Sequence, residues 1–275
     1  MIVCRSAAEL RRLREVNQLV GHVLEQLRDA VAPGVTTDDL DALAEREIRA
    51  GGAVPAFKGY KGYPATICAS VNEQVVHGIP SAKTVLGEGD IISIDLGAKM
   101  GGFFGDSAIT VGVGAITPGA AELLRVTEES LWKGIETIRP GARISDIGHA
   151  VQSHVEKFGF SVVREFVGHG IGSELHEEPQ IPNYGEPGRG PRLAEGMVLA
   201  IEPMVNLGDP GVRVLRDGWT AVTSDRSLSA HFEHTVAVTS DGAEVLSLVG
   251  DAERSGAGQG APASGARNRG AGAPG

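Results

Sequence analysis

Hydrophobic residues recur at helical spacing near the start of the chain and again near its middle. After Ser6, apolar side chains follow every three or four positions, and Glu9 completes a capping box with Ser6. Thr117 and Pro118 open a second such segment, with threonine as the N-cap and proline at the first helical position. Its pattern continues to about Ile138. Two long amphipathic helices are therefore expected.

Strict alternation of apolar and polar residues predicts a β-hairpin over residues 91–113, with Asp95 on one strand and Asp106 on the other. A two-residue turn at 100–101 would set the aspartates directly opposite each other, and a turn at 101–102 would set them diagonally. Either register keeps both carboxylates on one face. Directly opposed carboxylates would repel, so a proton or a metal ion is expected between them.

The second half of the chain repeats features of the first at a distance of 107 residues. A helix end, a short amphipathic helix, a turn and a strand recur in phase, which indicates internal duplication. Two unrelated α/β modules that share turn chemistry are the alternative. We expect one domain over residues 1–250, with halves at roughly 1–115 and 116–250. The matching pairs are Pro33-Gly34 with Pro140-Gly141, Asp39-Leu40 with Asp146-Ile147, Gly52 with Gly159, and residues 86–89 with 193–196.

The same offset places Glu202 where Asp95 stands, and Glu233 opens a strand that resembles the one beginning at Asp106. If the halves pack about a pseudo-two-fold axis, four carboxylates converge, and His169, between two glycines, adds a nitrogen. Any one of these residues alone would fit a purely structural role. Together they form an oxygen-rich set suited to two divalent first-row ions, without the thiolates of structural zinc sites. Two such ions can generate a hydroxide and polarise a carbonyl, so this set of residues predicts a hydrolytic reaction.

Composition excludes several classes of protein. Of the 275 residues, 41% are hydrophobic and 22% are charged, as is usual for globular proteins. The net charge of −10 argues against a DNA-binding protein with a general basic face. Two unpaired cysteines give no disulfide framework. No apolar run approaches the length of a membrane span, so we expect a cytoplasmic protein without a membrane partner. Residues 251–275, rich in glycine and alanine, are expected to form a disordered tail.

Several motifs resemble the pita-bread metallopeptidases and, within them, the type I methionine aminopeptidases. This resemblance implies a mixed α/β (α+β) pita-bread fold, with an antiparallel sheet, outer helices and two pseudo-two-fold-related halves. It implies that two divalent ions (Co, Mn, Fe or Zn) support removal of methionine from nascent protein N-termini, at the ribosome, when the second residue is small. A monomer is expected. The motifs are residues 59–64, 76–80, 168–172, 176–179, 201–204, 217–219 and 229–235, with Asp95 and Asp106.

The resemblance also implies roles for single residues. Asp95 would bind metal through both oxygens, Asp106 and Glu233 would bridge the two ions, and His169 and Glu202 would complete the set. Glu202 would also move a proton during the reaction. His77 and His176 would hold the substrate backbone and stabilise the tetrahedral intermediate. The S1 pocket for the methionine side chain is expected at Tyr60, Tyr63, Cys68 and Trp219.

Three positions depart from the family pattern. His231 stands where glutamine is usual, and strand alternation places it on the same face as Glu233. It could hydrogen-bond a ligand carboxylate or take part in proton transfer, and we favour the hydrogen bond. Phe57 replaces a common cysteine and Leu175 a common aromatic residue. Because of these three changes, the sequence does not predict the shape of the pocket or the pH dependence of the activity.

Three other groups of pita-bread proteins are alternatives. Aminopeptidase P and prolidase, which act on Xaa-Pro substrates, share the five ligands but normally carry a separate N-terminal domain. Type II methionine aminopeptidases have a helical insertion between the last two acidic ligands, whereas only 30 residues separate Glu202 from Glu233 here. A non-catalytic pita-bread binding protein would have lost ligands, and all five are present.

Overall fold

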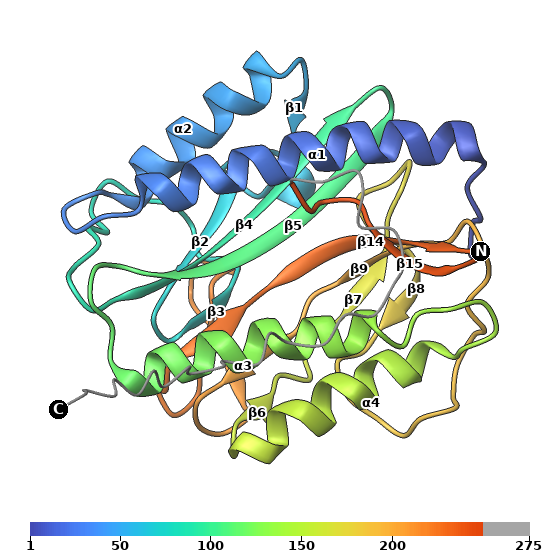
Figure 1. The fold of residues 1–275 in the computed structure, drawn as a ribbon. Coiled ribbons are helices and arrows are strands. Elements are labelled where there is room, and N and C mark those ends of the chain that lie inside the picture. The colour runs from blue at the N-terminus through green and yellow to red at the C-terminus, as the bar shows by residue number, and fades with distance from the viewer. Residues whose placement is uncertain (250–275) are drawn as a thin grey trace, which may run out of the picture.

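Nine strands form the central sheet of the computed structural model, which describes residues 1–249 (Figure 1). The strand order is β1-β4-β5-β14-β9-β7-β8, with β2 paired to β4 and β15 paired to β14. Neighbouring strands run antiparallel, as expected. The predicted tail, residues 251–275, lies outside the described residues. The strands are β1 (Val54–Pro55), β2 (Ile67–Val71), β4 (Ile91–Met100), β5 (Phe103–Gly112), β7 (Gly168–Gly170), β8 (Glu177–Ile181), β9 (Val198–Ile201), β14 (Glu233–Thr239) and β15 (Gly242–Val245).

Two smaller sheets of three strands each complete the strand structure of the described residues. In the first, β10 (Met204–Asn206) lies between β13 (Ser229–His231) and β6 (Ser161–Val162). In the second, β12 (Ala221–Thr223) lies between β11 (Val212–Val214) and β3 (Gln74–Val76).

Four α-helices cover the sheet (Figure 1). Helix α1 packs against β4 and β5, and α3 packs against β14 and β9. None of the described helices is long and apolar enough to span a bilayer. The helices are α1 (Ala7–Ala30), α2 (Thr37–Ala50), α3 (Pro118–Ile135) and α4 (Ile144–Val155), with 3₁₀ turns η1 (Tyr60–Gly62) and η2 (Glu156–Phe158).

The helix starts agree with the predicted caps. The Ser6 hydroxyl accepts from the Glu9 N–H, and the Glu9 carboxylate accepts from the Ser6 N–H, which confirms the capping box. Thr117 caps α3, as predicted. The end of α3 was predicted too late, because the chain tightens into i→i+3 bonds, including the one from the Ile138 N–H to the Ile135 carbonyl. Such a tightened turn is a common helix ending.

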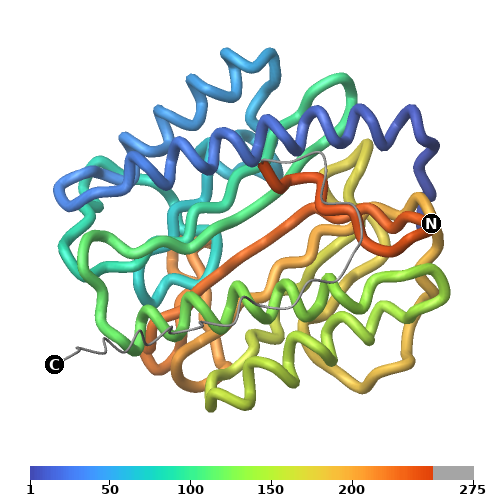
Figure 2. The backbone as a smooth tube through the Cα atoms, in the orientation of Figure 1, coloured from blue at the N-terminus to red at the C-terminus, as the bar shows by residue number. Residues whose placement is uncertain are grey.

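Backbone contacts recur at the spacing seen in the sequence. The Gly34 N–H donates to the Leu86 carbonyl at 2.8 Å, and the Gly141 N–H donates to the Leu193 carbonyl at 2.8 Å. These repeated bonds support the predicted two halves, which Figure 2 traces in blue to green and in green to red. Two further pairs repeat at the same spacing: the isolated bridges Thr36–Val85 and Arg143–Arg192, and the caps Thr36–Asp39 and Arg143–Asp146.

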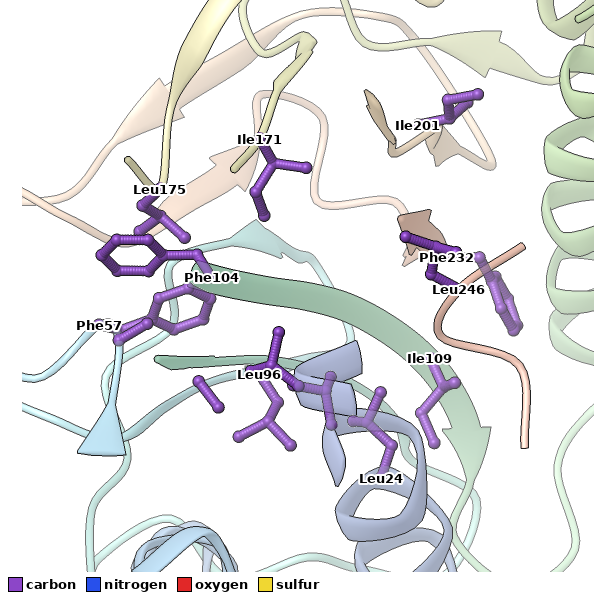
Figure 3. Close-up of a cluster of buried hydrophobic side chains, with 14 of the residues drawn as sticks. Leu24, Phe57, Leu96, Phe104, Ile109, Ile171, Leu175, Ile201, Phe232 and Leu246 are labelled. Carbon is purple, nitrogen blue, oxygen red and sulfur yellow. The ribbon is translucent and has the colours of Figure 1, made fainter. Parts of the chain in front are cut away.

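The main hydrophobic core extends from α1 across the β4–β5 hairpin into the second half (Figure 3). Leu24 of α1, Leu96 of β4 and Ile201 of β9 all belong to this cluster. Each such side chain contributes about 1.5–3 kcal/mol by its removal from water. The core therefore includes residues of both halves and holds the strands that carry the acidic residues.

Candidate metal centre and active site

Asp95 and Asp106 lie on one face of the β4–β5 hairpin. Gly101 and Gly102 form its turn with φ values of 59° and 88°. A two-residue hairpin turn with positive φ at both positions favours glycine, so the chain adopts the second of the two predicted registers. Asp106 pairs with Gly97, two residues beyond Asp95, and the two aspartates are therefore diagonal neighbours.

The second half contributes Glu233 and Glu202. Glu233 begins β14 and pairs with Ala108 of β5, which brings it beside the aspartates. Glu202 was predicted within a strand, but β9 ends at Ile201 and Glu202 follows it. The next residue is Pro203, which has no N–H to donate to a strand ladder, so the ladder stops before it.

His169 lies on β7, between β8 and β9. A side chain at Gly168 would clash with the Ala200 carbonyl, and one at Gly170 would clash with the Glu178 carbonyl. The two glycines therefore let the neighbouring strands approach His169. The Gly170 carbonyl accepts from His169 Nδ1 at 2.9 Å. Because Nδ1 carries the hydrogen, Nε2 keeps a lone pair available to a metal ion, and it lies 3.5 Å from a Glu202 oxygen.

The side chains of Asp106, His169 and Glu233 form one compact group of potential ligands. One potential ligand atom from each lies within 4.8 Å of the others. These residues are only 3%, 7% and 2% exposed. Among the described residues, one buried oxygen each of Asp95, Asp106 and Glu233 has no hydrogen-bond partner. Buried carboxylate oxygens without donors fit a site that binds cations.

The four acids are unfavourable neighbours in the absence of a cation. Burial raises the pKa of Asp95 to about 7. Burial also raises the pKa of Asp106, and the charges of Glu233 and Asp95 raise it further. The pKa of Glu202 and that of Glu233 rise for the same two reasons, burial first and neighbouring carboxylates second. A divalent ion removes this repulsion, so the donor set fits divalent first-row metals.

His176 lies beside this cluster. Its ring stacks on Tyr60 with centroids 5.3 Å apart, and its centroid is 4.2 Å from that of His169. The Tyr60 hydroxyl lies 2.9 Å from His176 Nδ1. Burial, then the positive charge of neighbouring groups, lowers the pKa of His176 to about 3, so the ring is neutral near pH 7.

His77 has a left-handed backbone conformation with φ 60°. Its ring meets Phe166 and Trp219 edge-on, with centroids 5.4 Å and 6.2 Å away. Burial lowers the pKa of His77.

A cavity of about 210 Å³ lies over the acids. Tyr63 and Trp219 meet edge-on in its wall, and Cys68 of β2 pairs with Asp95 of β4. The structure thus brings together every predicted site residue: Asp95, Asp106, His169, Glu202, Glu233, His77, His176, His231, Tyr60, Tyr63, Cys68 and Trp219. Sequence reasoning missed five lining residues, whose only signal was a place beside or within a motif: Lys61, Val76, Phe166, Val167 and Met204.

His231 is 2% exposed and lines the same cavity as Glu233. The single strand assumed for both is broken at Phe232, so His231 ends β13 and Glu233 begins β14 in a different sheet. Thr110 holds the His231 backbone by two hydrogen bonds, of 2.9 and 2.7 Å. Within the described residues, His231 Nε2 has no hydrogen-bond partner. Burial lowers the pKa of His231 to about 3.

The remaining two departures, Phe57 and Leu175, belong to one hydrophobic cluster and line the same cavity (Figure 3). Phe57 also packs on Gly97, where a side chain would clash with its ring. Both residues therefore shape the apolar wall of the cavity rather than its acidic floor.

A curved antiparallel sheet that brings four acids and a histidine together in the wall of one cavity defines a metal-dependent hydrolase. Residues 11–240 match metallopeptidase family M24. The chain is 54% identical over 249 residues to methionine aminopeptidase 1 of Bacillus subtilis (strain 168), covering 90% of this chain and 100% of that protein. The chain belongs to metallopeptidase family M24, within its methionine aminopeptidases, and the predicted family and hydrolase class are confirmed.

Solved structures agree with this assignment. The methionine aminopeptidase of Thermotoga maritima is 48% identical with a TM-score of 0.89, over 90% of this chain and 99% of that chain. The methionine aminopeptidase of Rickettsia prowazekii is 42% identical with a TM-score of 0.89, over 90% of this chain and 100% of that chain. The predicted pita-bread fold is thereby confirmed.

Proposed function

We propose that this protein hydrolyses the N-terminal methionine from peptides and nascent proteins whose second residue is small. The observation that carries the proposal is the cluster of buried, unpartnered carboxylate oxygens beneath an aromatic cavity. The acids can bind cations, and the adjacent cavity can bind an apolar side chain of the substrate.

Five residues would hold two divalent ions of Co, Mn, Fe or Zn: Asp95, Asp106, His169, Glu202 and Glu233. The unpartnered oxygens and the available His169 Nε2 support this set. Such ions lower the pKa of water and polarise a carbonyl.

Glu202 would accept a proton from the attacking water and pass it to the leaving amine. Its support is its position in the wall of the cavity, with one oxygen 3.5 Å from His169 Nε2. The Asn183 Nδ2 donates to the Glu202 carbonyl at 3.0 Å, which fixes the backbone of Glu202.

His176 and His77, which both line the cavity, would bind the substrate backbone. If the Tyr60 hydroxyl donates to His176 Nδ1, the neutral ring carries its hydrogen on Nε2. That N–H can then donate to the oxygen of the scissile carbonyl as negative charge develops there.

The methionine side chain would occupy the S1 pocket formed by Tyr60, Tyr63, Cys68 and Trp219. The Tyr63 hydroxyl donates to the carbonyls of Ile67 and Gly78, both at 3.0 Å, so its ring rather than its hydroxyl is left for the ligand. A flexible thioether packs well on aromatic rings.

Release of free methionine from Met-Ala-Ser by the purified, metal-supplied protein tests the proposal. Ala-Pro-Ser is the matched comparison for the alternative Xaa-Pro peptidase activity. We expect cleavage of Met-Ala-Ser and little cleavage of Ala-Pro-Ser. Faster cleavage of Ala-Pro-Ser, or of neither peptide, would contradict the proposal.

The resemblance to the methionine aminopeptidases also supports a setting for this activity. The protein would act as a monomer, in the cytoplasm, on nascent chains at the ribosome. Co-sedimentation with translating ribosomes, together with light scattering of the free protein, tests this part separately.

A further inference from the structure

The loop that carries His176 joins β7 to β8 and is tied to the N-terminal segment of the chain. Arg5, which precedes α1, donates from Nη2 to both carboxylate oxygens of Glu177. The side chains of Arg5 and Glu177 are only 6% and 12% exposed. This ion pair therefore joins two parts of the chain that are far apart in sequence, and it does so away from water.

Glu177 in turn organises the loop. Its Oε1 accepts from the backbone N–H groups of Ser173 and Glu174, at 2.8 and 3.1 Å, and from the Ser173 hydroxyl at 3.1 Å. Burial raises the pKa of Glu177, but the Glu174 N–H and the Arg5 guanidinium lower it, and the net pKa is below its usual value. The carboxylate thus stays charged and keeps all these donors.

The position of Arg5 is itself fixed by packing. Its backbone N–H donates to the Gly196 carbonyl at 2.7 Å. Its guanidinium lies against Gly172, where any side chain would clash with it, and its Cζ is 5.9 Å from the centre of the Phe103 ring. The Gly172 carbonyl accepts from the Phe104 N–H at 2.8 Å, which ties the start of the loop to β5.

We propose that Arg5 is a positioning residue for the reaction, acting through Glu177 to hold His176 at the scissile carbonyl. Tyr60 and His169 contact the His176 ring, and Arg5 binds Glu177, the residue that follows His176. Without the guanidinium, Glu177 is a largely buried carboxylate without a counter-ion, and the loop must move to solvate it. The inference rests on the proposed role of His176.

Arg5→Gln tests the proposal in the full-length, metal-supplied protein. We expect kcat for Met-Ala-Ser to fall roughly 10- to 100-fold, as a misplaced catalytic group would cause, with KM and metal stoichiometry nearly unchanged. Arg5→Lys keeps the positive charge and should restore part of kcat. Arg14→Gln is the matched control, because it breaks an exposed ion pair between Arg14 of α1 and Glu244 of β15. Its kcat should equal that of the wild type.

The decisive measurement repeats Arg5→Gln in a His176→Ala background. If Arg5 acts through His176, the second substitution lowers kcat no further. An equal loss of kcat in both backgrounds would overturn the proposal, because the effect of Arg5 on kcat would then be independent of His176. An unchanged kcat in His176→Ala alone would instead overturn the role proposed for His176. If Arg5→Gln does not fold, Arg5→Lys is used in the same two backgrounds with the same expected pattern.

Discussion

Asp95 and Asp106 are diagonal neighbours across the β4–β5 hairpin, because Asp106 pairs with Gly97 rather than with Asp95. Directly opposed Cβ atoms would be about 5 Å apart, and a diagonal pair is more widely spaced. The turn at Gly101-Gly102 sets this register. The turn therefore determines how much room for ions exists between two acids that are four and six residues away from it in the sequence.

Asp106→Asn should lower both metal occupancy and kcat by orders of magnitude while the protein stays folded. The reason is that Asp106 offers a ligand atom within 4.8 Å of those of His169 and Glu233. Elemental analysis and methionine release from Met-Ala-Ser measure the two effects. Near-normal turnover with saturating metal would show that the site has been assigned to the wrong residues.

The same substitution should stabilise the metal-free protein near neutral pH. Burial raises the pKa of Asp106 well above its ordinary value in the folded state. The folded protein therefore binds this proton more tightly than the unfolded chain, and ionisation of Asp106 destabilises the fold as pH rises. With chelator present, we expect Asp106→Asn to melt above the wild type at pH 8 and the gain to shrink towards pH 4. Glu25→Gln, on the exposed face of α1, is the control. A gain that is the same at both pH values would contradict this electrostatic account.

Helix starts were predictable because their signals are local. The Ser6–Glu9 capping box lies within four residues, and Thr117 directly precedes α3. The turn residues of the β4–β5 hairpin are also a local signal, and they left only two possible registers. The break at Phe232 was not predictable, since it arises where the chain passes from one sheet to another. Nor was the pairing of Arg5 with Glu177, because an ion pair between distant segments leaves no periodic pattern in the sequence.

Peptides with a small second residue should be the preferred substrates. The cavity of about 210 Å³ must hold the methionine side chain, so the next side chain has to fit between the cavity wall and His77. We expect Met-Ala-Ser to be cleaved with a much higher kcat/KM than Met-Lys-Ser. Equal kcat/KM values for the two peptides would argue against a role in methionine excision.

His231→Gln should retain metal stoichiometry and keep kcat within roughly tenfold, the lower end of the effect of residues that support metal ligands. His231 is buried with Nε2 unpartnered in the cavity, and a glutamine amide there could supply a donor to a neighbouring carboxylate. Metal analysis and kcat check this expectation. Loss of metal binding in this variant would mean that His231 is itself a ligand and that the five-residue set is incomplete.

The central claim is that this acidic cluster makes methionine release depend on divalent metal. The most direct test follows methionine release from Met-Ala-Ser by chelator-treated wild-type protein while Mn, Co, Fe or Zn is titrated back. We predict no release without metal and recovery of activity with at least one of these ions, with Leu-Ala-Ser cleaved poorly under the same conditions. Full activity in the presence of chelator, or equal release from Leu-Ala-Ser, would contradict the claim.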